Sequence, residues 1–169
     1  MHSTFYYQSP LGDVEINADD NDALVSVMFV ESIKKQSPKL PATANISPEI
    51  EKYVLQLDEY FAGKRVDFDV RFRHEGSDFQ KKVWEELCHI PAGKTISYLE
   101  LSRRIGNVKA IRAVGTTNGN NKISIIVPCH RVIGADGSLV GYGGDLWRKK
   151  WLLEHEQKMV GIAQQLALF

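Results

Sequence analysis

Cys129 and His130 stand side by side in this chain, directly after Pro128 and at the end of the apolar run Ile125–Val127. Proline has no N–H for a sheet ladder and fixes its own φ, so we expect a buried strand to end here and to hold the thiol in one orientation. The thiolate is the reactive form of cysteine, and a nearby imidazole or guanidinium, such as that of Arg131, favours it. Free cysteines are often small core residues. Because its neighbours are polar, we interpret Cys129 as a candidate nucleophile.

A nucleophilic thiol needs a base and a group that orients the base. We interpret His130 as the candidate base and Glu156 as the candidate orienting acid. Glu156 shares the inward stripe of an expected C-terminal helix with Leu152 and Leu153, where a carboxylate is costly unless it is paired. Adjacent residues of an extended chain point to opposite sides, so we expect His130 to act on the Cys129 thiol through a bridging water.

Composition limits the class of protein. Of the 169 residues, 43% are hydrophobic, which is enough for the core of one domain or two small ones. The chain has no run of 18 apolar residues and no signal-peptide pattern at its start, so we expect no membrane contact and a cytoplasmic location. Cys88 and Cys129 show neither CxxC nor paired Cys/His spacing, so we expect no disulfide framework, no metal site and no cofactor. Cys88, with only His89 as a basic neighbour, is interpreted as a structural thiol.

The two halves of the chain carry opposite net charges, although the net charge of the whole chain is zero. Residues 1–77 hold 8 Lys and Arg against 13 Asp and Glu, whereas residues 78–169 hold 13 against 8. A basic C-terminal half can meet phosphate while the acidic half faces away. Solvated surfaces also produce such asymmetry, so this observation alone leaves both interpretations open.

The N-terminal half predicts a small scaffold. Strand patterns cover 4–7, 14–16 and 24–30, and turn residues separate them as in an antiparallel meander. Residues 32–47 are typical of a loop, after which Ser47 and Pro48 predict the start of a helix that ends near Gly63. Alternation of apolar and polar residues from Val66 to Phe72 predicts a further strand. No chemistry is visible in this half.

The C-terminal half predicts three helices, a hairpin and a long final helix. The first helix starts at Ser77 or Asp78 and ends at Cys88, the second starts with the Ser-x-x-Glu pattern of 97–100, and the third runs from a cap at Asn107 to about Asn118. The last two have helix-turn-helix spacing. Strands on either side of the turn 134–137 predict a hairpin, and a last helix starts near Asp145. We therefore expect an α+β fold, with a scaffold domain at 1–77 and a winged helix-turn-helix-like domain at 78–169.

The third of these helices has two unlike faces. The face expected to pack inward holds Ala110, Ile111, Val114 and Thr117. The opposite face holds Val108, Arg112, Gly115 and Thr116, so it is small except for one arginine. A glycine inside a helix is unfavourable, so Gly115 suggests close approach by a nucleic-acid backbone or by the protein itself.

These residues carry a family resemblance. The stretch Pro128–Gly134 resembles the active-site signature of the O6-alkylguanine-DNA alkyltransferases, and further motifs fall at that family's spacing. The further motifs are Phe79–Trp84, Ile90–Gly93, Ser97-Tyr98, Arg112–Gly115, Asn121, Gly141–Gly144, Trp151–Leu153 and Glu156. The resemblance covers roughly Phe79 to Glu156, whereas residues 1–77 match the family only in general layout.

The resemblance implies a suicidal, single-turnover transfer. Glu156 would hold His130, His130 would polarise a water, and the water would take the proton of the Cys129 thiol. Cys129 would then displace the alkyl group from guanine O6 and keep it as a thioether. One protein molecule would repair one base in double-stranded DNA.

The target atom lies inside the duplex, so the damaged nucleotide must be flipped out of the stack. The resemblance implies that Arg112 fills the vacated space and that its helix, with Ala113 and Gly115, lies in the minor groove. Tyr98 would bond the flipped base and Asn121 would brace the turn before Cys129. The other residues implied to contact substrate or DNA are Ser97, the Val132 carbonyl, Tyr142 and the Gly143 amide.

Two other classes of protein share part of this pattern. A winged-helix transcriptional regulator would have the helix pair without needing Cys129-His130, and it would usually dimerise on palindromic sites, whereas an alkyltransferase is expected to be a monomer. A cysteine hydrolase would need a histidine that reaches the thiol directly, and it would turn over. The sequence does not indicate the preferred alkyl group, the choice between O6-alkylguanine and O4-alkylthymine, or the role of the rather apolar tail 157–169.

Overall fold

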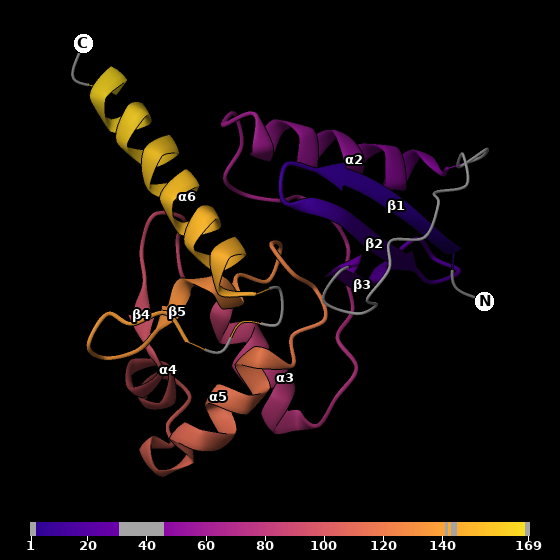
Figure 1. Cartoon of the computed structure of the whole chain (residues 1–169). Helices are drawn as coiled ribbons and strands as arrows, with labels where there is room; N and C mark the ends of the chain where they lie inside the picture. Colours follow the sequence, from indigo (N-terminus) through magenta and orange to yellow (C-terminus); the bar gives the residue numbers. More distant parts are fainter. Residues whose placement is uncertain (1–2, 31–45, 141, 143–144, 168–169) are drawn as a thin grey trace. The chain divides into compact units, whose positions relative to one another are not determined.

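The computed structural model describes residues 3–30, 46–140, 142 and 145–167 of the chain (Figure 1). The chain divides into two compact units. The first consists of Met1–Glu75 with Lys122–Ser124, and the second of Gly76–Asn121 with Ile125–Phe169. No helix in the described part of the chain is long and apolar enough to cross a membrane. That residues 1–77 and 78–169 are two domains that fold independently remains a prediction.

The first unit is a three-stranded antiparallel sheet with one helix. The strands β1 (Ser3–Ser9), β2 (Gly12–Ala18) and β3 (Leu24–Phe29) pair in chain order, as the meander pattern predicts. Helix α2 (Pro48–Phe61) runs along this sheet (Figure 1). The Ser47 side chain accepts a hydrogen bond from the Ile50 amide, which confirms the predicted cap. The core combines alternate strand residues with one face of α2, and its members include Phe5, Val14, Ile16, Val27, Phe29, Tyr53, Leu57 and Tyr60.

The strand predicted from Val66 to Phe72 is wrong. Only Phe72 makes a bridge, to Leu24 of β3, and the residues before it have no ladder partner. The Gln56 side chain of α2 accepts from the Asp69 amide at 2.8 Å and donates to the Asp69 carbonyl at 3.1 Å. A side-chain amide therefore supplies the hydrogen bonds that a strand partner would supply, and the chain stays extended beside the helix.

A short piece of the C-terminal sequence completes the first unit. Val27 in β3 donates to the Lys122 carbonyl at 2.7 Å, and the Ser124 amide donates to the Val27 carbonyl at 2.9 Å. Ile123, fully buried between them, forms a parallel bridge with Val27. The residues just before the Cys129 segment are thereby anchored to the edge of a sheet.

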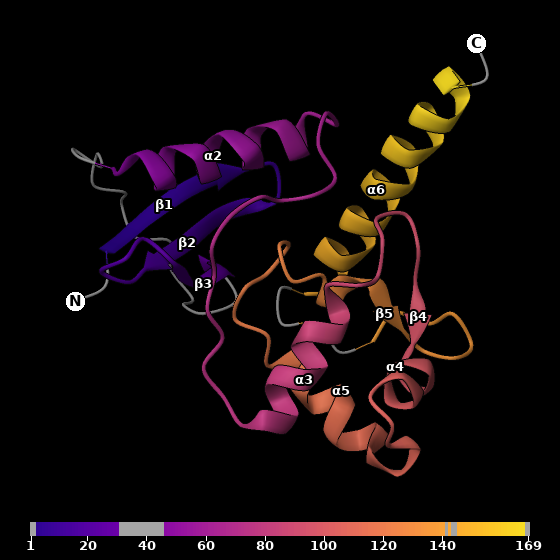
Figure 2. The same cartoon turned by 180° about the vertical axis from the view of Figure 1, so that it is seen from behind.

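The second unit is mainly helical. It holds α3 (Asp78–Leu87), α4 (Tyr98–Arg104), the 3₁₀ turn η1 (Val108–Ala110), α5 (Ile111–Gly119) and α6 (Leu146–Ala167). The Ser77 and Gln80 side chains form a reciprocal capping box at α3. The Trp84 indole of α3 donates to the Thr117 carbonyl of α5 at 2.9 Å, which fixes these two helices to each other. Figure 2 shows α3 and α5 from behind. The α+β class with an antiparallel N-terminal sheet and a helical C-terminal part is thus confirmed.

Three details of the helix-turn-helix differ from the prediction. Asn107 makes no side-chain cap, and the helix opens with η1 before α5 begins. Ile111, predicted to pack inward, is 39% exposed. The tighter pitch of a 3₁₀ turn rotates the residues that follow it relative to a continuous α-helix, which accounts for the displaced Ile111.

The predicted hairpin after Cys129 is wrong as a strand pair. Val132–Ile133 form β5, but β5 pairs in parallel with β4 (Ile96–Ser97), and residues 138–140 form no strand. The turn itself exists, because the Gly134 amide donates to the Ser138 carbonyl and the Asp136 carboxylate accepts from Ser138. Turn residues were recognisable in the sequence, whereas the strand partner was not. Most of the predicted loop 32–47 lies outside the described residues.

Candidate active site

Cys129 lies in a compact turn and not at the end of a strand. Pro128, with φ −83° and ψ 64°, sits at the centre of an inverse γ-turn that the Cys129 amide closes on the Val127 carbonyl at 2.8 Å. The 3₁₀ turn η2 (Cys129–Arg131) follows at once. Earlier in the segment Ile125 has φ 73°, a left-handed conformation that is rare for a β-branched residue. The predicted strand is therefore wrong, but the expected role of Pro128 in orienting Cys129 agrees with this geometry.

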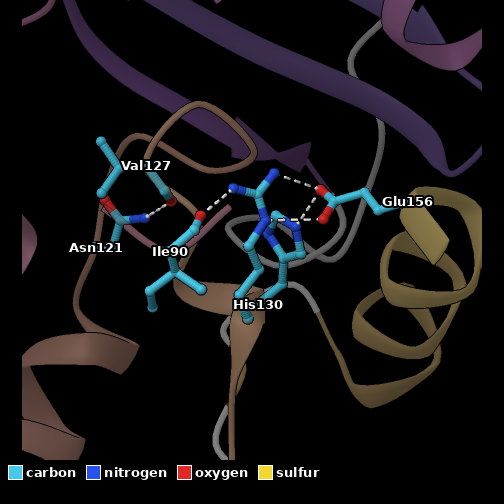
Figure 3. Close-up of polar contacts among 6 residues, drawn as sticks. Ile90, Asn121, Val127, His130 and Glu156 are labelled. Carbon is cyan, nitrogen blue, oxygen red and sulfur yellow. Dashed lines mark hydrogen bonds and ion pairs between the residues drawn. The ribbon is translucent and has the colours of Figure 1, made fainter. Parts of the chain in front are cut away.

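Two asparagine side chains support the turn around Cys129. Asn121 donates to the Val127 carbonyl at 2.8 Å, as drawn in Figure 3. Asn118, at the end of α5, donates to the Cys129 carbonyl at 3.2 Å. Asn121 was singled out by the family resemblance. Asn118 was missed, although a buried amide next to the inward-facing Thr117 is a recognisable signal, because buried polar groups need partners.

His130, Arg131 and Glu156 form a buried group that we call the Glu156 cluster. The Glu156 carboxylate accepts from His130 Nε2 at 2.6 Å, from Arg131 Nε at 2.8 Å and from an Arg131 terminal nitrogen at 3.0 Å (Figure 3). Arg131 also donates to the Ile90 carbonyl at 2.6 Å. His130 and Glu156 are fully buried and Arg131 is 6% exposed. The structure thus places Glu156 against His130, as the apolar stripe of α6 predicts, and adds Arg131, which the sequence interpretation did not assign.

The electrostatics of the cluster follow from these contacts. Burial alone would raise the pKa of Glu156, but the charge and hydrogen bond of His130, with those of Arg131, hold this pKa well below its usual range. Glu156 is therefore a permanent anion at neutral pH. Because Nε2 of His130 is committed to Glu156, the other ring nitrogen, Nδ1, is the one left for chemistry. Nδ1 is buried and has no hydrogen-bond partner within the part of the chain that the structure describes.

The Cys129 thiol is 5% exposed, and burial raises its pKa. A hydrogen bond from Asn121, the charge of Lys149 and the backbone amides of Cys129 and His130 oppose this effect without overcoming it. A buried thiol with a raised pKa is mostly protonated at neutral pH, so it needs a base before it can attack. The second cysteine, Cys88, caps α3 and donates to the Trp84 carbonyl, and burial raises its pKa as well.

The comparisons with known proteins cover nearly the whole chain. Residues 78–158 match the family described as 6-O-methylguanine DNA methyltransferase, DNA binding domain, and residues 3–73 match the ribonuclease-like domain of the same family. A methylated-DNA–protein-cysteine methyltransferase of Methanosarcina acetivorans is 44% identical over 89% of this chain and 95% of its own length. The chain belongs to this family.

Solved structures of relatives agree with this assignment. The crystal structure of the Mycobacterium tuberculosis O6-methylguanine methyltransferase has a TM-score of 0.79 and 41% identity, over 94% of each chain. The same organism's protein crystallised in complex with DNA has a TM-score of 0.78 and 42% identity, over 91% of this chain and 92% of that one. The family match over residues 78–158 includes the Cys129 turn and Glu156.

Of the residues predicted to contact substrate or DNA, Tyr98 lies on α4, and Arg112, Ala113 and Gly115 lie on α5. Arg112 and Ala113 are exposed on α5, and Ser97 caps α4 by accepting from the Glu100 amide. A Cβ built on Gly115 would lie 3.8 Å from the Tyr98 ring, an ordinary contact. The protein's own packing therefore does not require glycine at 115, which favours the alternative that something outside the chain approaches it. Tyr142 is half-buried, and Gly143 lies outside the described residues.

Lys149 is a site residue that the sequence analysis missed. Its ammonium group is fully buried and donates to the Val132 carbonyl at 2.6 Å and to the Val140 carbonyl at 2.8 Å. The Tyr98 hydroxyl donates to the same Val140 carbonyl at 2.9 Å. Burial lowers the pKa of Lys149 to about 8, and the charge of Cys129 opposes that shift. In a run of Arg148, Lys149 and Lys150, no sequence signal separates the buried lysine from the exposed one.

We expect Lys149→Met to disfavour the Cys129 thiolate. The substitution removes a positive charge near Sγ, so the ionisation constant of the thiol should fall roughly tenfold and its pKa should rise. The absorbance of the thiolate as a function of pH, measured in a Cys88→Ala background, gives this value directly. Lys150→Met, at an exposed position next in the chain, is the matched control and should leave the titration unchanged. Identical curves for Lys149→Met and its parent would contradict the prediction.

Proposed function

We propose that this chain repairs O6-alkylguanine in duplex DNA by irreversible transfer of the alkyl group to Sγ of Cys129. The observation that carries the proposal is the turn that holds Cys129 directly beside the buried Glu156 cluster, in the segment matched by the family. Such a cluster orients a histidine next to a thiol whose pKa burial raises. The names of the relatives, methylated-DNA–protein-cysteine methyltransferase and O6-methylguanine methyltransferase, support the same chemistry here.

The reaction we propose uses only side chains and water. A water between Nδ1 of His130 and Sγ takes the thiol proton and passes it to His130, whose resulting charge Glu156 stabilises. The S–C bond then forms while the bond between O6 and the alkyl carbon breaks, and its electron pair leaves with guanine. Tyr98 supplies a proton or a hydrogen bond to the guanine ring. Burial raises the pKa of Tyr98, so this hydroxyl stays protonated at neutral pH, and in this step its O–H turns from the Val140 carbonyl, to which it donates at 2.9 Å, to the base.

The DNA contacts of the proposal come from α4, α5 and the segment after η2. Arg112 enters the stack in place of the flipped nucleotide, while Ala113 and Gly115 keep the rest of that helix face low enough for the minor groove. Asn121 keeps the Cys129 turn rigid. The base itself meets a second group of residues, which consists of Ser97, Tyr98, the Val132 carbonyl, Tyr142 and the Gly143 amide.

The proposed site fits a monomer that works in the cytoplasm. All proposed reacting groups come from one chain, so a second copy is not needed to complete the site. A thiol nucleophile must stay reduced, which the cytoplasm provides. The reaction consumes the thiol, so each molecule acts once and needs neither metal nor cofactor.

The test is the mass of the protein after incubation with an excess of an O6-methylguanine duplex. We expect a gain of one methyl group per molecule, found by peptide mapping on Cys129 and not on Cys88. A methyl group on Cys88, more than one lesion repaired per molecule, or full activity in Cys129→Ala would each overturn the proposal. Binding without any gain of mass would favour a DNA-binding regulator instead.

A further inference from the structure

The two polar atoms of the buried Asn118 side chain differ in their contacts. Asn118 is 1% exposed, and its Nδ2 donates to the Cys129 carbonyl at 3.2 Å. Its Oδ1 is closed to solvent and has no hydrogen-bond partner among the residues that the structure describes. A buried acceptor without a donor costs free energy, and such groups are few in folded proteins. This acceptor stands beside the carbonyl group of the residue that carries the proposed nucleophile.

The orientation of the Asn118 amide is set by this neighbour. A carbonyl oxygen can only accept, so the side of the amide that faces the Cys129 carbonyl must be the NH₂ group. Turning the amide over would set two acceptors against each other at that distance. Oδ1 is therefore an acceptor in a fixed position, next to the Cys129 turn.

The Asn118 amide also lies against Tyr98, the second group that the proposed reaction brings to the base. A Cβ on Gly115, three residues earlier on α5, would lie 3.8 Å from the Tyr98 ring, and residues three apart share a helix face. Burial and the charge of Cys129 raise the pKa of Tyr98, and a hydrogen bond from the Asn118 side chain opposes them. A flipped base held between Tyr98 and Sγ of Cys129 therefore comes next to Oδ1.

The main-chain acceptors around the Cys129 turn already have donors. The Cys129 carbonyl accepts from the Asn118 side chain and from the Val132 amide, which fills both of its lone pairs. Lys149 donates to the Val132 carbonyl at 2.6 Å and to the Val140 carbonyl at 2.8 Å. Among these three carbonyls and Oδ1, Oδ1 alone has no donor in the described part of the chain. A ligand that enters with an N–H group therefore gains most by donating to Oδ1.

We propose that Oδ1 of Asn118 accepts a hydrogen bond from the exocyclic amine of the flipped guanine and thereby selects O6-alkylguanine over O4-alkylthymine. This selection rests on the function proposed above, in which a flipped base lies next to Sγ. On its minor-groove edge guanine carries the N2 amine, a donor, whereas thymine carries O2, an acceptor. Guanine supplies the donor that Oδ1 lacks, while thymine sets one acceptor against another.

Oδ1 is closed to solvent, so a base reaches it only when a neighbouring group moves. The proposed reaction already contains such a movement, because the Tyr98 hydroxyl turns from the Val140 carbonyl to the base. The hydrogen bond to the amine then forms as the base takes its place. Recognition of the amine is thereby coupled to the arrival of the proton donor.

Two other roles of Asn118 explain less of this geometry. A side chain that only braced the Cys129 turn would need Nδ2, and the cost of the buried Oδ1 would have no return. Phosphate oxygens are acceptors, so the DNA backbone offers nothing to Oδ1. A donor on the base edge is the partner that Oδ1 fits.

The test compares single-turnover methyl transfer from three duplexes. They contain O6-methylguanine, O6-methylhypoxanthine, which lacks only the exocyclic amine, and O4-methylthymine. In the parent we expect O6-methylhypoxanthine to react roughly tenfold more slowly than O6-methylguanine, which is the scale of one hydrogen bond. O4-methylthymine should react roughly 100-fold more slowly, because a site built for a donor rejects a base without one.

Variants of Asn118 separate recognition from support of the turn. Asn118→Leu removes the acceptor at similar volume, so the rate ratio of guanine to hypoxanthine should fall from roughly tenfold to below about twofold. All its rates should also fall, because the Cys129 carbonyl loses a donor. Asn118→Asp loses the same donor but keeps an oxygen acceptor, so it should keep a ratio close to that of the parent. Asn120→Leu, at an exposed position two residues later, is the matched control and should react like the parent with all three duplexes.

The ratios of rates decide the outcome, because a general loss of packing would slow all three substrates alike. Equal rates with guanine and hypoxanthine in the parent overturn the selection by Oδ1 and leave the proposed repair function standing. A ratio that Asn118→Leu keeps, or that Asn118→Asp loses together with Asn118→Leu, also overturns it. If the parent takes no methyl group from O6-methylguanine, the proposed function itself is overturned, and the selection with it.

Discussion

Glu156→Gln is expected to slow alkyl transfer roughly 100-fold, the usual scale for losing general-base assistance. Glutamine keeps the shape of the side chain but removes the charge that favours a proton arriving on His130. The Cys129 thiol depends on that proton transfer, because burial raises its pKa. The affinity for DNA should stay nearly the same, since phosphate binding depends on exposed Lys and Arg.

The same substitution should lower the free energy of unfolding by about 3 kcal/mol, because it removes one partner of a buried ion cluster. Arg131 would keep its hydrogen bond to the Ile90 carbonyl, but it would lose the anionic Glu156 acceptor that lies 2.8 Å from its Nε. The sign of the pH dependence follows from the lowered pKa of Glu156. Its contribution is present above the unfolded value near 4.5 and is lost as the pH falls below it, so the parent and the variant should converge in acid.

Single-turnover rates, a DNA titration and chemical denaturation of the variant check these expectations. Glu154→Gln is the matched control, because this exposed glutamate lies about half a helical turn earlier and forms a long surface ion pair with Lys150, at 3.9 Å. That variant should change stability by less than about 0.5 kcal/mol and leave the rate unchanged. A normal rate with lost stability in Glu156→Gln would reduce Glu156 to a structural role. Lost DNA binding would mean instead that α6 had detached.

The parts of the structure that sequence could predict are those set by local chemistry. Ser47 and Ser77 stand where helix caps must stand, and the structure has both side-chain caps. Glu156 was identified because a carboxylate on an apolar stripe requires a partner. In each case, nearby residues or the helical repeat were enough to predict the feature.

The errors come from interactions that join distant parts of the chain. Alternation from Val66 to Phe72 reports alternating exposure, which an extended chain beside α2 also shows, so it could not reveal that Gln56 replaces a strand partner. Lys149 is buried because two carbonyls converge on it. Arg131 was taken for a neighbour of the thiol, yet it pairs with a residue 25 positions away. The local sequence pattern indicates neither that Lys149 is buried nor which distant groups converge on Lys149 and Arg131.

Arg112→Ala should slow repair in duplex DNA roughly 100-fold and leave the reaction with free O6-benzylguanine unchanged. Flipping a base costs a few kcal/mol, and a side chain that occupies the empty position offsets part of this cost, with about 1.4 kcal/mol for each factor of ten. The free base has no stack to leave, so it does not need Arg112. A lesion in single-stranded DNA should lie between the two.

The charge of Arg112 can be separated from its shape with Arg112→Lys. Lysine keeps a cation for phosphate but lacks the planar guanidinium that stacks on bases, so it should restore DNA affinity without restoring the duplex rate. Single-turnover rates on the three substrates and a binding titration at two salt concentrations give the answer. Full rescue by lysine would assign Arg112 to phosphate binding, because only its charge would then matter. Equal losses on duplex and free base would show that Arg112 acts on the Cys129 turn from within the protein.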